Sequence, residues 1–310
     1  MRKTYKRIFK DGSGKMKLCR GKVHYYLVMN LDYTIKGEVK TTMIPYIKEM
    51  IKDFQKYDPS TDKKTNTPAQ EFLFKVDDKS RLIDYPRVKV FHTFVAKSLF
   101  ATKRYRPNIH TAVDFLTTRV RGPNKDDWKK QLILLQYLRN TTDMPLTLHA
   151  DGINIVKWWV DVSYAVHTDI RSQTGGTILL GKGAIISTSI KQKMNTKSLT
   201  ETEIIVANDL MPHILWTNYS LNCQGYNAKE TIIYQYNKSA ILLEKKSKKS
   251  ISKRKKQIAI QYYFITDRVK ADELNIEYCP TGDMVADYFT KPLQSNKFYQ
   301  FRKEMMNLMD

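Results

Sequence analysis

Four stretches of the sequence lie where strand ends and helix starts could bring side chains to one site. They are Asp161 in WWVDVSYAV, Glu201 and Glu203 in SLTETEIIVA, the segment YQYNKSAI, and Asp287 in GDMVADYFTKPL. Carboxylate oxygens are the hard ligands that Mg²⁺ prefers, and two such ions can hold the attacking and leaving oxygens of a phosphodiester. This set is compatible with two-metal phosphoryl chemistry if the fold brings the segments together.

Asp161 is set among apolar neighbours in residues 157–189, which are predicted to form two or three antiparallel strands. Because side chains alternate along a strand, Val160 and Val162 share one face and Asp161 shares the other with Ser163. An exposed strand face beside water is the alternative interpretation of this pattern.

The segments around Asp161 predict a mixed α/β layer, because strands and helices alternate after an antiparallel start. Gly175-Gly176 and residues 181–183 are expected to be turns. A long helix follows, which Thr200 could cap with Glu203 three positions later, and which ends near Gln224. The remaining expected elements are a strand at 231–237, helices from 238 and over 258–270, a strand at 275–279 and a last helix pair.

The first half of the chain predicts a hairpin followed by a small helical bundle. Residues 23–43 are expected to form two strands around a turn at Lys36-Gly37. Apolar residues then recur at helical spacing over 44–54, and a polar loop with three prolines covers 58–86. The three further predicted helices span 88–104, 108–120 and 126–140.

The composition favours a polyanionic partner. Among 310 residues, Lys and Arg outnumber Asp and Glu by 53 to 31, a net charge of +22, and such an excess attracts nucleic acid. No apolar run approaches the roughly 18 residues of a spanning helix, and no signal peptide is recognisable. Three distant cysteines argue against a disulfide framework. We therefore expect a cytoplasmic or nuclear protein that is neither secreted nor membrane-bound.

The blocks VDVSYAVH, QTGGTILLGKGAIISTSIKQK, SLTETE, YQYNKSAILLEK and VADYFTKPLQ resemble the ribonuclease H domain of copia-type retrotransposon polyproteins, over about residues 150–300. The segments GKVHYYLVMNLDY and FHTFVAKSLFATKRYRPNIHTAV resemble the primer-gripping hairpin and the thumb and connection of the same polyprotein. The resemblance implies a reverse transcriptase fragment at 1–149 and a ribonuclease H-like α/β domain at 150–310. The polymerase palm is expected to precede this chain, so polymerase activity is not expected.

The resemblance also implies site roles. Asp161, Glu203 and Asp287 would hold two Mg²⁺ ions and act in catalysis, with Glu201 a weaker rival to Glu203. Where the family has a metal-binding Asp, this chain has Tyr236. A phenol is neutral at pH 7 and bulkier than a carboxylate, so hydrolysis is expected to be impaired. Whether Glu201 or Asp283 replaces the lost ligand is left open by the sequence.

A basic run near the end of the chain could follow the phosphates of an RNA–DNA hybrid or of DNA, or could be a solvated loop. Other products of the polyprotein are a second class of expected partner. The rival to a ribonuclease H-type endonuclease is a non-catalytic, basic nucleic-acid-binding remnant. The run consists of Lys245, Lys246, Lys248, Lys249, Lys253, Arg254, Lys255 and Lys256.

Overall fold

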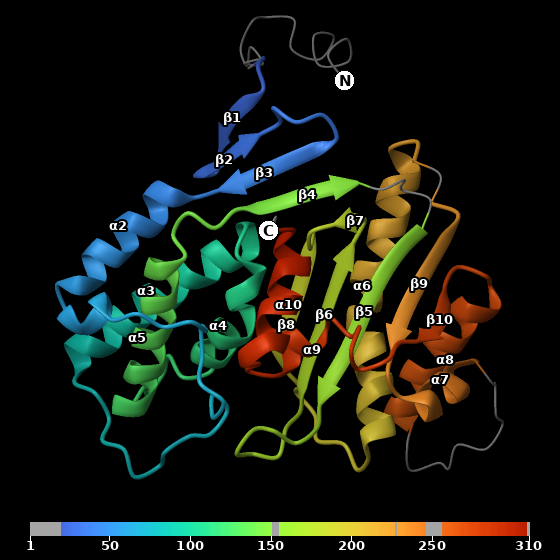
Figure 1. Ribbon diagram of the computed structural model, residues 1–310. Helices are drawn as coiled ribbons and strands as arrows, with labels where there is room; N and C mark the ends of the chain where they lie inside the picture. Colours follow the sequence, from blue (N-terminus) through green and yellow to red (C-terminus); the bar gives the residue numbers. More distant parts are fainter. Residues whose placement is uncertain (1–19, 151–154, 227, 246–255, 309–310) are drawn as a thin grey trace, which may run out of the picture.

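The computed structural model describes residues 20–150, 155–226, 228–245 and 256–308, which form two five-stranded sheets with helices packed around them (Figure 1). The first sheet is antiparallel and has the order β1-β2-β3-β4-β7. Its strands are β1 (Val23–Tyr26), β2 (Met29–Asp32), β3 (Glu38–Thr42), β4 (Leu146–Ala150) and β7 (Gly181–Lys182).

The second sheet is mixed and has the order β10-β9-β5-β6-β8. The strand β5 pairs antiparallel with β6 and parallel with β9, while β8 and β10 form the edges. Its strands are β5 (Ile155–Ser163), β6 (Gln173–Leu179), β8 (Ile186–Lys191), β9 (Glu230–Gln235) and β10 (Asn275–Tyr278). This mixed sheet, its flanking helices and the preceding helical region confirm the predicted α/β fold class.

Helices cover both faces of the mixed sheet. Val156, Trp158 and Val160 of β5 are fully buried and pack with apolar side chains from one group of helices. That group is α6 (Leu199–Cys223), α7 (Lys238–Lys245) and α8 (Lys256–Lys270). The helices α9 (Asp287–Thr290) and α10 (Ser295–Met306) belong to the larger core on the other side, and α9 contacts β5, β6 and β8.

The predicted helical bundle is present in the first half of the chain. Its elements are α2 (Ile44–Gln55), η1 (Pro59–Asp62), α3 (Tyr85–Arg104), η2 (Pro107–Ile109), α4 (His110–Thr117) and α5 (Lys125–Asn140). Asn124 and Asp127 form a reciprocal capping box at the start of α5, which satisfies two backbone donors that the helix itself cannot pair. The helix α4 also packs on β8, so the bundle and the mixed sheet are in direct contact.

Three local predictions are wrong. Residues 23–43 form three strands, because Leu27 and Val28 make a tight turn at φ 48° and 67°, a conformation that sequence signals assign to Gly or Asn. Gly175-Gly176 is not a turn but lies inside β6. The cap of α6 is Ser198 rather than Thr200. Among the described residues, no helix is both long and apolar enough to cross a membrane.

Candidate active site

Asp161 lies near the end of β5 with its side chain on the face opposite the Val160 and Val162 side chains. It is 5% exposed, and its Oδ2 accepts a 2.5 Å hydrogen bond from Thr290 Oγ1 of α9. Burial raises its pKa to about 6, although the nearby Lys291 ammonium opposes that shift. The predicted exposed alternative for Asp161 is therefore wrong, since α9 covers this strand face.

A glycine makes the approach of α9 possible. Gly175 is paired with Asp161 in the register of β5 and β6. A Cβ at Gly175 would lie 2.5 Å from Thr290 Cγ2 and 2.9 Å from Phe289 Cβ, distances that real Cβ atoms do not adopt. On the other side of the sheet, Gly176 similarly admits Leu210 of α6. The two glycines therefore mark close packing of a helix on each face.

Asp287 begins α9 and is 2% exposed. Lys291 Nζ lies 2.6 Å from Asp287 Oδ1 and 3.5 Å from Asp161 Oδ2, so one ammonium bridges the two carboxylates. Lys297 Nζ lies 2.5 Å from Asp287 Oδ2. Burial alone would raise the pKa of Asp287, but the hydrogen bonds from the two lysines outweigh it and hold that pKa below its usual value.

Glu203 lies in the first two turns of α6 and is 2% exposed. Its Oε2 atom has no hydrogen-bond partner among the described residues. Burial raises the pKa of Glu203 well above its usual value, and the charges of Asp161 and Glu244 raise it further. Asp287 also acts on this carboxyl electrostatically, so the side chains of Asp161, Glu203 and Asp287 share one electrostatic neighbourhood.

Glu201 has a different local role at the start of α6. Its backbone N–H donates to Ser198 Oγ at 3.3 Å, and its Oε2 accepts from the backbone N–H of Lys197 at 3.1 Å. Two early backbone donors are thus satisfied, as in a capping box. The helix begins two residues earlier than predicted, so Glu201 and not Glu203 takes part in its cap. The carboxylate of Glu203 is instead buried in the protein.

Tyr236 follows the last residue of β9. The parallel register pairs Trp159 with Tyr234, so two residues further along, Tyr236 comes level with Asp161 on the neighbouring strand. Tyr236 is 48% exposed. Asp283 is exposed. Burial raises the pKa values of Cys279 and Glu304, and the charge of Asp283 raises them further.

Two charged residues at this site were missed by the sequence analysis. Glu244 of α7 is fully buried, and burial raises its pKa to about 8, while a 3.4 Å hydrogen bond from Gln235 Nε2 opposes the shift. It follows the buried Ala240 by four residues, and this spacing on the apolar stripe of the helix was the available signal. The other is Lys291, whose two acidic partners include one from a distant strand.

The donor type at this site suits a divalent cation, since Asp161, Glu203 and Asp287 are buried carboxylates and one Glu203 oxygen lacks a partner. Two observations oppose a ready-made metal centre. Within the part of the chain that the structure describes, no three His, Cys, Asp or Glu side chains are grouped as metal ligands. Lys291 also supplies a positive charge to two of the three carboxylates. A metal would have to compete with this ammonium.

The predicted phosphate-binding run lies mostly outside the described residues. Lys245 ends α7 and is exposed, and Lys256 begins α8. The members that the structure does not describe are Lys246, Lys248, Lys249, Lys253, Arg254 and Lys255.

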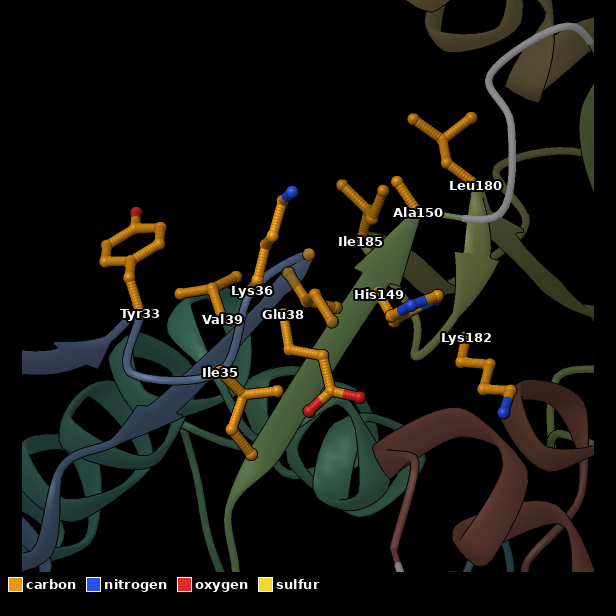
Figure 2. Close-up of a pocket in the computed structure, with 12 residues that line it drawn as sticks. Tyr33, Ile35, Lys36, Glu38, Val39, His149, Ala150, Leu180, Lys182 and Ile185 are labelled. Carbon is orange, nitrogen blue, oxygen red and sulfur yellow. The ribbon is translucent and has the colours of Figure 1, made fainter. Parts of the chain in front are cut away.

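A pocket of about 300 Å³ lies elsewhere, between the β2–β3 connection, β4 and β7 (Figure 2). Apolar side chains such as Ile35, Val39 and Ile185 line it together with Lys36, Glu38, His149 and Lys182. None of the carboxylates described above contributes to its lining, so this pocket is separate from the candidate site.

No protein-family model matches the chain. The chain is similar to the Retrovirus-related Pol polyprotein from transposon TNT 1-94 of Nicotiana tabacum, with 29% identity over 234 residues that cover 75% of this chain and 17% of the relative. It is also 29% identical to that from transposon RE2 of Arabidopsis thaliana, over 64% of this chain and 14% of the relative. The resemblance to copia-type transposon polyproteins is confirmed. The chain spans less than a fifth of the length of these two relatives.

Solved structures similar to this chain include the foamy viral protease-reverse transcriptase in complex with an RNA/DNA hybrid. That likeness covers 84% of this chain and 29% of the viral chain, with 11% identity and a TM-score of 0.46. The N-terminal RNase H domain of a Mycobacterium tuberculosis protein is similar over 44% of this chain and 90% of that chain, with 11% identity and a TM-score of 0.33.

Proposed function

We propose that this chain binds nucleic acid as the ribonuclease H-like part of a transposon polyprotein, and that its metal-dependent hydrolysis of RNA in RNA–DNA hybrids is impaired. The net charge of +22 supports binding to a polyanion. The observation that carries the proposal is the buried group of Asp161, Glu203 and Asp287, with exposed Tyr236 directly after the end of the adjacent strand β9. It supports a two-metal nuclease ancestry with one carboxylate replaced.

In this proposal Asp161, Glu203 and Asp287 would hold Mg²⁺. When bound, the metal would supply the positive charge that stabilises a phosphodiester under attack by water. The chain's own residues oppose this state in two ways. Tyr236 contributes no carboxylate, and Lys291 already forms ion pairs with Asp161 and Asp287. Loss of one ligand is expected to lower the rate on the order of a hundredfold.

A second candidate is a nucleic-acid-binding protein with no hydrolytic activity. The bridging contact of Lys291 favours it, because an internal cation satisfies the two aspartates without a metal. In this alternative the acidic group contributes to the packing of α9 on β5 and no longer to chemistry. The excess of Lys and Arg over Asp and Glu would still give affinity for phosphates, with a steep dependence on salt.

The test compares wild type with Tyr236→Asp on a labelled RNA–DNA hybrid, with binding and cleavage followed in Mg²⁺. The control is Tyr85→Asp, which changes an exposed tyrosine on α3. We expect both variants and wild type to bind the hybrid, and Tyr236→Asp to cut it on the order of a hundred times faster. Equal cleavage by wild type and Tyr236→Asp would contradict impairment. Binding without cleavage by any of them would favour the non-catalytic candidate.

A further inference from the structure

We propose that Tyr236, Tyr278 and Lys238 form a platform on which an unpaired base of a nucleic-acid strand stacks. This tyrosine platform rests on the proposed nucleic-acid binding and names the part of the strand that is recognised. Its three residues come from the end of β9, the end of β10 and the start of α7. The platform gives Tyr236 a role in binding, at the position where the resembled family has a metal-binding carboxylate.

The parallel pairing of β9 with β10 brings the tyrosines together. Tyr278 is paired with Gln235, so Tyr236, the next residue of the chain, emerges beside it. The two ring centroids lie 6.1 Å apart, with an angle of 36° between the ring planes. Lys238 Nζ lies 4.5 Å from the centre of the Tyr278 ring. Two aromatic faces and one ammonium therefore occupy one small surface.

The rings remain open to solvent in this arrangement. Tyr236 is 48% exposed and Tyr278 is 42% exposed. Two residues earlier on β9, Tyr234 packs on Trp159 with ring centroids 5.2 Å apart, and both are largely covered. Along β9, the aromatic contacts thus change from a covered one with β5 to an exposed one with β10, at the point where β9 ends.

An exposed aromatic pair with an adjacent ammonium suits a nucleobase and its phosphate. Every base presents a π-face that stacks on tyrosine regardless of sequence, and lysine attracts the phosphate of the same strand. Bases inside a duplex are already stacked on both faces. The expected ligand is therefore a single strand, or an unpaired base at the end of a hybrid, rather than the interior of a duplex.

The test uses the full chain and fluorescence anisotropy with two labelled single-stranded DNA probes, one with all its bases and one with abasic sites. Tyr278→Ala and Tyr236→Ala are each expected to weaken binding of the intact strand about tenfold. Neither change is expected to alter binding of the abasic strand. Tyr278→Phe should retain the affinity of wild type, because the ring is kept.

Tyr85→Ala is a matched control. Tyr85 is 71% exposed on α3, and Lys89 Nζ lies 4.8 Å from the centre of its ring, which reproduces the chemistry of Tyr278 and Lys238 away from the platform. This variant is expected to bind both probes as wild type does. A loss of affinity equal to that of Tyr278→Ala would show that any exposed tyrosine has this effect, and the platform would be rejected.

The outcomes separate the platform from the proposed function. If wild type binds neither probe, nucleic-acid binding fails and the platform fails with it. If wild type binds but Tyr278→Ala and Tyr236→Ala bind the intact strand as tightly, only the platform is overturned. Equal losses on intact and abasic strands would also overturn it, since stacking requires the base. Melting temperatures equal to that of wild type would show that the variants are folded.

Discussion

Thr290 Oγ1 donates a 2.5 Å hydrogen bond to Asp161 Oδ2, although 129 residues separate them in the chain. The contact exists because Gly175, opposite Asp161 in the sheet, has no side chain where Thr290 enters. Asp287 and Lys291 lie on the same short segment as Thr290. The packing of α9 on two strands thus determines where the acidic group forms.

Gly175→Ala tests this packing. The added Cβ would meet Thr290 Cγ2 at 2.5 Å, and the backbone oxygen of Ala286 at 3.0 Å, so α9 must shift. We expect the free energy of unfolding to fall by about 1–3 kcal/mol, as for other overpacked cores. Urea denaturation measures it, with Gly122→Ala as control because no atom lies within 4 Å of a Cβ there. Unchanged stability in Gly175→Ala would show that α9 is not held by this contact.

Lys291→Gln tests the internal cation. The change leaves the buried carboxylate of Asp161 without its bridging ammonium, and the loss of stability at pH 7 is expected to be about 1–2 kcal/mol. This is less than the loss for a fully buried pair, because the Lys291 side chain is 42% exposed. Millimolar Mg²⁺ should raise the melting temperature of this variant more than that of wild type, because a cation can then reach both aspartates.

The control for that experiment is Lys129→Gln, which changes an exposed lysine on α5. It should respond to Mg²⁺ as wild type does. If Mg²⁺ raises the melting temperature of Lys291→Gln no more than that of Lys129→Gln, the Lys291 ammonium does not compete with a metal.

Asp114 should make stability depend on pH. Burial raises its pKa from 3.8 to about 6, against hydrogen bonding by Gln173 and the charges of Lys103 and Lys191. The folded state therefore holds this proton where the unfolded state has released it, and stability falls as pH rises from about 4 to about 6. Asp114→Asn removes this pH-dependent contribution to the free energy of unfolding, which amounts to about 3 kcal/mol over the whole window.

The measurement is the difference in unfolding free energy between wild type and Asp114→Asn at several pH values across that window. Taking the difference cancels the other titrating groups, as long as they keep their surroundings. We expect the free energy of unfolding of Asp114→Asn to increase relative to that of wild type as pH rises. A difference that is constant with pH would mean that the pKa of Asp114 is not raised by folding.

Local periodicity was sufficient to predict several elements of the fold. The apolar repeat predicted the helix that runs over Tyr85–Arg104, and the alternation in β5 separated Asp161 from Val160. The features that the sequence did not predict depend on contacts between distant segments. The pair Gly175-Gly176 is of a type that is common in turns. Only the close approach of α9 explains why Gly175 lies inside a strand.

The charged residues at the candidate site show the same limit. Glu244 belongs to a segment rich in lysine, and it is buried because α7 packs on α6 and α8. Lys291 has one partner four residues away, but its other partner, Asp161, lies on a distant strand. Charge pairs of this kind follow from tertiary packing, which neither residue type nor spacing specifies.

Titration of Mg²⁺ into wild type and Tyr236→Asp by calorimetry tests the central claim most directly, because it measures the acidic site without requiring turnover. A restored carboxylate beside Asp161 should tighten Mg²⁺ binding about tenfold or more. Adding Asp161→Asn to Tyr236→Asp should abolish that gain. Equal affinity in wild type and Tyr236→Asp would contradict the view that Tyr236 occupies a lost metal-ligand position.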